Sequence, residues 1–165
     1  MKNADLSKLR TLLDQYINSP TDNPVAEHAN ADNDMSLMIH DQGLLAWHQH
    51  FLAKLEHWLV LNGGEKYVPL PYWNAKDNIP SQLNKGNNNV NVSLPTNLKP
   101  ESLKKINRYS VLNNRIRLYH DNVHNSMGGQ MPNRQTSPSD PIFWPFHSFL
   151  LAIYEQWRTL KKVTV

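Results

Sequence analysis

The chain has 165 residues, enough for one domain with a sizeable core. Its 17 basic and 14 acidic residues give a formal net charge of +3 and are scattered rather than clustered, so we expect no nucleic-acid partner. The absence of cysteine excludes disulfides, thiolate metal sites and a thiol nucleophile. No apolar run approaches the about 20 residues of a membrane span, and the start shows no signal peptide, so we expect no membrane partner and assign no compartment.

Hydrophobic periodicity predicts two long helices in the first half of the chain. In chain order, we expect a helix, a loop, the clearest helix of the chain and an extended but irregular segment (residues 4–20, 21–34, 44–64 and 65–74). The alternative for the loop is a short helix around His28. Gly63 and Gly64 end the second long helix.

The second half of the chain is also predicted to be helical, after a long asparagine-rich surface loop. In chain order, we expect that loop, a helix that starts near Pro100, a further helix, a second loop and a last helix (residues 78–99, 100–106, 114–124, 131–139 and 140–160). Asp140 is the predicted N-cap of the last helix, with Pro141 in its first position. The chain is therefore predicted to be mainly α, with long irregular loops.

At least three histidines stand on helix faces that point inward. His120 and His124 are four residues apart, so both rings leave one face of a helix and could bind one metal ion. Such a pair also occurs by chance on solvated faces. His147 and His48 share the apolar stripes of their own helices. A single core histidine is usually only a hydrogen-bonded polar group, so these residues gain meaning only as a set.

The set extends to His40, eight residues before His48, and to His28 in the segment before that. Burying six imidazoles without partners is costly, and a metal site removes the cost. No carboxylate stands at ligand spacing beside them, which disfavours the carboxylate-bridged zinc or manganese pairs of two-metal hydrolases. Three histidines could hold a catalytic zinc ion, but an all-imidazole donor set favours copper. Two such copper sites face to face could bind dioxygen.

Four sequence motifs resemble those of the type-3 copper proteins, which are the tyrosinases, catechol oxidases and molluscan hemocyanins. The motifs, in the order of that family, are WHQHFLAKLE around His48, LPYWN with Asn74 in the place of an aspartate, HDNVHNSMGG around His120 and His124, and DPIFWPFHSFLLAIYEQW around His147. The resemblance implies a single domain over residues 1–165, in which an antiparallel four-helix bundle encloses a dinuclear copper site.

The resemblance also implies the ligands of two copper ions, copper A and copper B. They are His28, His40 and His48 for copper A, and His120, His124 and His147 for copper B. His28 is assigned by its order in the chain alone, and its alternative is a plain loop histidine. His50 and His57 lie off the ligand face of their helix and are expected on the surface.

The sequence departs from the family pattern at several positions. Asp121 stands where many tyrosinases carry an asparagine that helps a water to deprotonate phenols, so it is the candidate catalytic residue; its alternative is an exposed helix charge. Phe146 stands where a second histidine often precedes the ligand. Leu151 and Ala152 replace an Asp-Arg pair, so we expect a structural ion pair to be missing there.

The family places the segment after the second copper-B ligand at the substrate entrance. Asn125 and Met131 are therefore candidate entrance residues, with a loop turn and simple packing as their alternatives. The chain has no room after Trp157 for a covering domain, so we expect an open site. A homodimer that covers it is the other outcome.

The resemblance implies a copper-dependent oxidoreductase that uses dioxygen to hydroxylate monophenols, to oxidise o-diphenols to o-quinones, or both. Its substrate would be a small phenol or catechol. The alternatives are a hemocyanin-like dioxygen-binding protein, an o-aminophenol oxidase, and a helical bundle whose histidines bind metal adventitiously.

Overall fold

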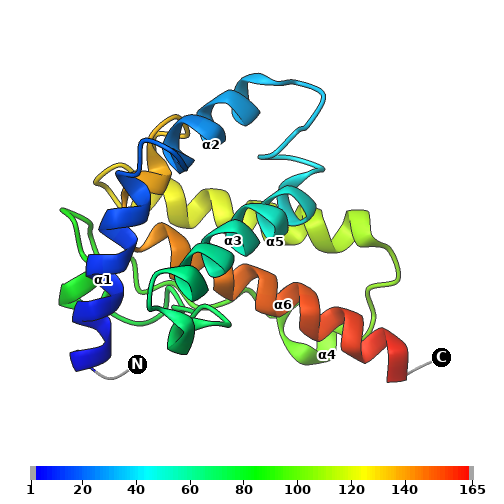
Figure 1. Cartoon of the computed structure of the whole chain (residues 1–165). Coiled ribbons are helices and arrows are strands. Elements are labelled where there is room, and N and C mark those ends of the chain that lie inside the picture. The colour runs from blue at the N-terminus through cyan, green and yellow to red at the C-terminus, as the bar shows by residue number, and fades with distance from the viewer. Residues whose placement is uncertain (1–2, 164–165) are drawn as a thin grey trace.

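The computed structural model describes residues 3–163 and is built from six α-helices (Figure 1). They are α1 (Asn3–Ile17), α2 (Pro24–Asn33), α3 (Leu44–Leu61), α4 (Pro100–Leu103), α5 (Tyr109–Ser126) and α6 (Phe143–Val163). Four short 3-10 helices lie in the loops, at Glu65–Tyr67, Ser81–Leu83, Thr96–Leu98 and Ser137–Ser139. No strand is found in residues 3–163. The mainly α class is confirmed, and the antiparallel four-helix bundle remains a prediction.

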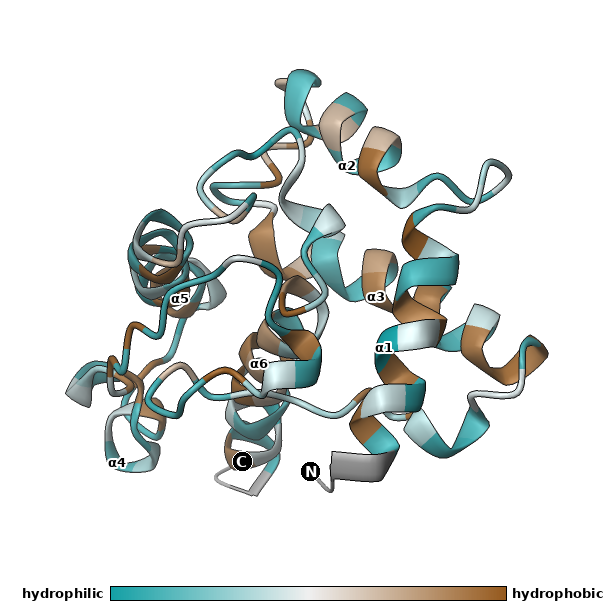
Figure 2. Cartoon of the chain, turned by 90° about the vertical axis from the view of Figure 1, so that its left-hand side faces the viewer, coloured by the Kyte–Doolittle hydropathy of each residue, from teal (hydrophilic) through white to brown (hydrophobic). Residues whose placement is uncertain are grey.

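The core forms where α3 and α6 lie against each other, with α1 packed against the C-terminal half of α3 and the first turn of α6. Leucines at spacings of three and four residues turn one face of α3 inward, and Leu55 and Leu59 are fully buried. Phe51 of α3 stacks on Trp144 of α6, with ring centroids 5.0 Å apart. Figure 2 shows the hydrophobic residues of these helices gathered on their facing sides. Burial of each such side chain contributes about 1.5–3 kcal/mol.

Residues 24–33 form a helix where a loop was the first expectation, so the alternative of a short helix around His28 is the one the structure confirms. Asn23 caps α2 by accepting a hydrogen bond from the backbone N–H of Ala26 at 3.4 Å, and Pro24 occupies its first turn. Asparagine followed by proline is a helix-start signal. It was outweighed because α2 carries few apolar residues and so shows little periodicity.

Asp140 is not the N-cap of the last helix, which was a wrong prediction. The helix α6 begins at Phe143, and the Asp140 carboxylate is fully buried. Its Oδ2 accepts hydrogen bonds from Asn87 Nδ2 at 2.8 Å and from the Gln130 backbone N–H at 2.9 Å. This carboxylate therefore joins the asparagine-rich loop to the turn that follows α5.

The asparagine-rich loop is hydrogen-bonded to that turn. The backbone N–H of Asn88 donates to the Met127 carbonyl at 2.6 Å, and Asn87 pairs with Gly128 in an isolated β-bridge. Gly128 and Gly129 both have positive φ, at 67° and 59°, which side chains with a Cβ rarely adopt. A loop expected to lie on the surface thus fixes where α5 ends.

Candidate metal centre

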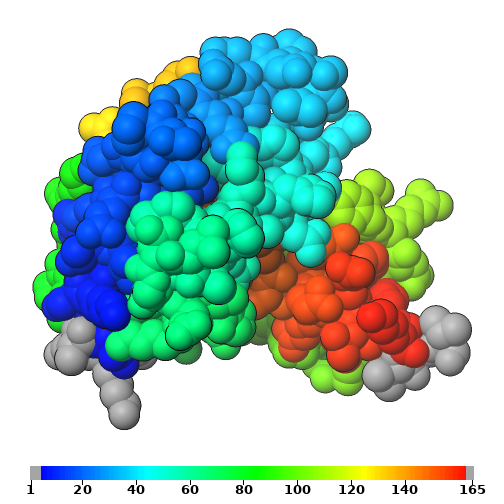
Figure 3. Space-filling view, in the orientation of Figure 1, coloured from blue at the N-terminus to red at the C-terminus, as the bar shows by residue number. Residues whose placement is uncertain are grey.

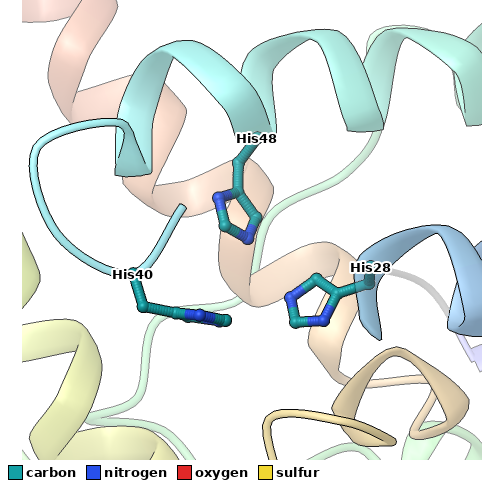
Figure 4. A group of neighbouring side chains, drawn as sticks. All are labelled: His28, His40 and His48. Carbon is teal, nitrogen blue, oxygen red and sulfur yellow. The ribbon is translucent and has the colours of Figure 1, made fainter. Parts of the chain in front are cut away.

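Three histidines from separate segments form a first group, which we call triad A. His28 comes from α2, His40 from the loop before α3, and His48 from α3 itself (Figure 4). The three rings point toward one another, with centroids 5.0 Å apart for His28 and His40, 5.7 Å for His28 and His48, and 6.1 Å for His40 and His48. One nitrogen of each ring lies within 4.8 Å of the others.

A second group, triad B, uses only two helices. His120 and His124 leave the same face of α5, as their spacing predicts, and His147 comes from α6. The ring centroids lie 4.3 Å apart for the α5 pair, and 5.1 Å and 5.2 Å from His147. These residues also offer one nitrogen each within 4.8 Å of one another.

The two triads adjoin, so all six predicted ligands lie in one site. His48 stacks on His147 with centroids 4.7 Å apart and an interplanar angle of 18°. His40 stacks on His120 at 6.1 Å. The remaining histidines, His50 and His57, are exposed, as expected. Six histidines are therefore buried and two lie on the surface, which is the division that the sequence predicted.

Backbone carbonyls fix the orientation of three of the six rings. The Nδ1–H of His48 donates to the Leu44 carbonyl at 2.8 Å, and that of His147 to the Phe143 carbonyl at the same distance. His124 donates from Nδ1 to the Met131 carbonyl at 2.7 Å. Each bond sets the tautomer, so the lone pair of Nε2 is left for a metal ion.

Carboxylates fix two further rings, one in each triad. His40 Nδ1 lies 2.7 Å from Oδ1 of Asp32, and His120 Nδ1 lies 2.8 Å from Oδ1 of Asp121. Asp32 is held in turn by Gln135, whose Nε2 donates to Oδ2 at 2.7 Å. Asp121 thus touches a predicted ligand directly, and Asp32 was missed because nothing in the sequence pairs it with a histidine eight residues away.

Most of the ring nitrogens that could bind a metal have no hydrogen-bond partner among the described residues. Nε2 of His48, His120, His124 and His147, and both ring nitrogens of His28, are buried without a hydrogen bond to any described residue. A buried polar atom left unpaired costs about 1–3 kcal/mol, and a ligand that takes the lone pairs would remove this cost. Imidazole nitrogens without oxygen donors suit copper, and the residues present fit two copper ions.

Burial keeps these imidazoles neutral, which is the form that binds metal. Burial, reinforced by the neighbouring His40, lowers the pKa of His28 to about 3. Burial likewise lowers the pKa of His124 to about 4. The pKa of the other four, His40, His48, His120 and His147, is also lowered by burial. All six therefore offer lone pairs at neutral pH.

Aromatic side chains close the inner side of triad B. Phe143 stacks on His147 with centroids 3.9 Å apart, and Phe146 lies parallel to His120 at 6.3 Å. Both phenylalanines are fully buried. Phe146, where relatives often carry a histidine, therefore supplies an apolar wall that excludes water from the site.

The cavity beside the triads is small, which contradicts the expectation of an open site. It has a volume of about 20 Å³, room for about one water molecule. Asn125 and Met131 both line it, Asn125 exposed and Met131 buried. Pro132 and Arg134 complete the wall, because the loop after α5 folds back over the site.

Two further hollows have different relations to the triads. One of about 200 Å³ shares His40 and Arg134 with the small cavity and is walled by Met35, Met38 and Ile39. The other, of about 970 Å³, lies between α3, the prolines of residues 69–71 and α6, and Figure 3 shows it as the recess beside the orange and red surface. It is lined by Leu151 and Ala152 among others and by no histidine, so its size says nothing about the metal site.

No helix in residues 3–163 is long and apolar enough to cross a membrane.

Comparisons with known proteins agree with this site. The model of the family described as "Common central domain of tyrosinase" matches residues 77–160, just over half of the chain. The tyrosinase-like protein tyr-3 of Caenorhabditis elegans is 42% identical over 43 residues, which are 26% of this chain and 6% of that protein. No solved structure matches. The family match contains every residue of triad B, and the structure sets triad A against it; the chain belongs to the tyrosinase family of copper oxidoreductases.

Proposed function

We propose that the chain binds two copper ions and oxidises phenolic substrates with dioxygen, as a tyrosinase or a catechol oxidase. The observation that supports this most is the pair of adjoining, neutral histidine triads, in which five of the six Nε2 atoms are buried without a hydrogen bond to any described residue. His28, His40 and His48 would hold copper A, and His120, His124 and His147 would hold copper B. In this proposal α2, α3, α5 and α6 form a four-helix bundle around the site within a single domain.

When bound, the two copper ions supply the redox chemistry that carries electrons from the substrate to dioxygen. For a diphenol, two catechols lose two electrons and two protons each, and one dioxygen becomes two waters. The protein contributes orientation: the Nδ1 hydrogen bonds of five histidines hold their rings before any ligand arrives. Phe143 and Phe146 keep water from the inner side.

Monophenol hydroxylation needs a proton removed from the phenol, and Asp121 is the candidate base. Its side chain is 26% exposed and lines the small cavity, so it can meet substrate as well as His120. Oδ1 is engaged by His120 Nδ1, and Oδ2 lies 3.5 Å from Nη1 of Arg117; we propose that Oδ2 accepts the phenol proton, directly or through a water. Burial raises the pKa of this carboxyl, which strengthens it as a base.

A dioxygen carrier is the second candidate, and the cavity volume favours it. About 20 Å³ admits a diatomic molecule and excludes an aromatic ring unless the loop over the site moves. The oxidase is preferred because the neighbouring hollow of about 200 Å³ reaches the same wall at His40 and is large enough for a phenol. No feature of the site distinguishes o-aminophenol from o-diphenol oxidation.

One experiment separates these functions. The purified chain is loaded with copper, its copper content is measured, and dioxygen uptake and quinone formation are followed with 4-methylcatechol. The oxidase gives two ions per chain and sustained quinone formation. Reversible dioxygen binding without quinone would establish the carrier. One ion or fewer per chain would contradict both proposals and leave adventitious binding.

A further inference from the structure

The hollow of about 200 Å³ beside triad A has a lining that suits a cation. Its charged side chains are the carboxylates of Asp32, Asp34 and Asp41 and one guanidinium, that of Arg134. Arg117 lies 3.5 Å from Asp41 and offsets part of the negative charge, but it does not line the hollow. Carboxylates along a cleft concentrate cations there and raise the rate at which cations arrive. The hollow therefore attracts positive ions.

Two methionines line the same hollow, and both are exposed to solvent. Met35 is 86% exposed and Met38 is 39% exposed, whereas the two methionines that follow α5, Met127 and Met131, are buried. A methionine usually fills an irregular gap in a core, which these two side chains do not do. A thioether is also a soft metal ligand that selects Cu(I) over harder ions. Two thioethers on one negatively charged hollow therefore indicate a soft cation as its ligand.

The backbone at Met38 is held in a conformation that methionine does not favour. Its φ is +49°, in the left-handed region, which costs a residue with a Cβ about 1–2 kcal/mol. Its carbonyl accepts hydrogen bonds from the backbone N–H groups of Asp41 and Gly43, both at 2.9 Å, and these bonds fix the turn. A glycine would fit this turn with less strain. The strain points to a use for the methionine side chain.

His40 connects this hollow to the predicted copper-A site. It lines the hollow and is the most exposed ligand of triad A, at 9% against 0% for His28 and 2% for His48. Its Nδ1 is engaged by Asp32, so Nε2 is the nitrogen left for a metal ion. An ion held in the hollow therefore reaches triad A first at His40.

We propose that Met35 and Met38 form a transient Cu(I) site through which copper reaches triad A. The inference rests on the proposed copper binding and adds the route by which the ions arrive. The two thioether sulfurs bind Cu(I), which then passes to His40 by exchange of ligands, with no change in its oxidation state. Three imidazoles that already converge bind copper more tightly than two flexible thioethers, so the transfer runs inward.

The test measures how fast the metal-free chain takes up Cu(I) in the absence of dioxygen. Unbound Cu(I) is trapped with bicinchoninate at set times and read from its absorbance. The double variant Met35→Leu/Met38→Leu removes both sulfurs and keeps the apolar volume. It should slow uptake on the order of 10-fold, the low end of what a charged cleft adds to an association rate, and still bind two ions per chain at the end. Leu37→Ala is the matched control: Leu37 is 42% exposed on the same loop and has no donor atom, so the rate should stay at the wild-type value.

A second ion separates a thioether site from a structural effect of the loop. Proteins bind Zn(II) through cysteine, histidine and carboxylates rather than thioethers, and three histidines can hold it. Zn(II) uptake, followed with a fluorescent indicator, should therefore be equally fast in the wild type and in the double variant. Equal slowing for both ions would mean that the substitutions only disturb the loop, and would overturn the proposal. Unchanged Cu(I) uptake would overturn it as well.

Silver ion reports the thioether site directly, because Ag(I) is soft and monovalent like Cu(I) but is stable in air. The chain is prepared with isotope-labelled methionine methyl groups and titrated with Ag(I) in the presence of Zn(II), which occupies the histidines. The NMR signals of Met35 and Met38 should shift, while that of buried Met127 should not. Unshifted signals of Met35 and Met38 would overturn the proposal. If the triads take up no copper, the proposed function fails by itself, and the silver titration still decides whether the two thioethers bind a soft ion.

Discussion

Triads A and B offer a metal ion the same donors, three imidazoles each, but they are assembled in different ways. Triad B takes two histidines from one face of α5 and one from α6, and all three Nδ1 atoms have partners. Triad A takes one histidine each from α2, a loop and α3, and neither ring nitrogen of His28 has a hydrogen-bond partner among the described residues. One triad follows from helix geometry, while the other depends on how three segments pack together.

The difference extends to what fastens each triad to the rest of the protein. Asp140 and the asparagine-rich loop hold the turn after α5, from which the Met131 carbonyl reaches His124. Triad A is held through Asp32, which contacts His40 and also accepts a hydrogen bond from Gln135, 103 positions further along the chain. We therefore expect triad B to be ready for a metal ion as soon as α5 and α6 meet, and triad A to be complete only when the whole chain has folded.

The largest expected effect comes from removing one ligand of either triad. His147→Ala should lose copper B and His48→Ala copper A, each leaving about one ion per chain and no measurable quinone formation, because both ions are needed. Copper content by elemental analysis and quinone absorbance measure the two effects. His57→Ala, an exposed position on the same helix as His48, is the control and should keep both ions. Two ions in either ligand variant would show that the triads are not the metal sites.

The ease of predicting each triad from sequence follows the same division. The i, i+4 spacing of His120 and His124 defines a face, so triad B could be predicted from local geometry. His28 could be assigned only by its order in the chain, because α2 is short and carries few apolar residues. Residue spacing within one helix can be read directly from the sequence. The docking of α2 against α3 cannot, because it depends on the whole fold.

The contacts behind the ligands were the least predictable part of the site. Asp32 and Gln135 meet through tertiary packing alone, and Asp140 was expected to cap α6 but is buried beneath the turn after α5. The six helices were mostly foreseen, because apolar periodicity reports burial within one element. Hydrogen bonds between loops leave no such period in the sequence.

Acid should unfold the copper-free chain through both triads. The folded-state pKa is about 3 for His28 and about 4 for His124, against an ordinary value of 6.5. Below pH 6.5 these two histidines bind protons in the unfolded chain but not in the folded chain. Their contribution to the free energy of unfolding is therefore fully present above pH 6.5 and falls as the pH drops toward 4. At pH 5.5 these two residues together should remove about 3 kcal/mol from the free energy of unfolding.

Urea unfolding at pH 7.5 and 5.5 measures this effect. In His28→Leu the loss between the two pH values should shrink by about 1.4 kcal/mol, because one of the buried histidines with a lowered pKa is gone. The exposed His50→Leu variant should show the full loss. A loss that is the same in all three chains would mean that burial of triad A does not control the acid sensitivity.

The two carboxylates offer a direct comparison between the triads. Asp32→Ala should weaken copper A and Asp121→Ala copper B, each by about 10-fold or more, because the ring behind the metal loses the partner that orients it. Competition with a chelator measures both affinities. Asp32→Asn keeps an acceptor oxygen and should recover most of the loss.

Asp121→Ala also tests the role of that carboxylate as a base. If Oδ2 accepts the phenol proton, monophenol turnover should fall further than diphenol turnover, since only the monophenol route needs this proton removed before oxygenation. Equal losses with the two substrates would restrict Asp121 to positioning His120. Asp32→Ala, whose carboxylate faces His40, should lower both turnovers alike.

The smallest effect is expected at the turn that supports triad B. Gly129 has φ +59°, and a Cβ there would lie 2.6 Å from Asn87 Nδ2 and 2.8 Å from Asp140 Oδ2. Gly63 also has positive φ, +80°, but a Cβ would meet nothing within 4 Å. Gly63→Ala therefore measures backbone strain alone, about 1 kcal/mol of unfolding free energy, and Gly129→Ala should cost about 1 kcal/mol more because Asn87 must give way. Since the same turn leads to Met131, Gly129→Ala should also weaken copper B relative to copper A, whereas Gly63→Ala should leave the two affinities unchanged. If the two alanine variants lose equal stability and keep equal copper affinities, the asparagine-rich loop does not hold triad B in place, and the contrast between the triads lies in the helices alone.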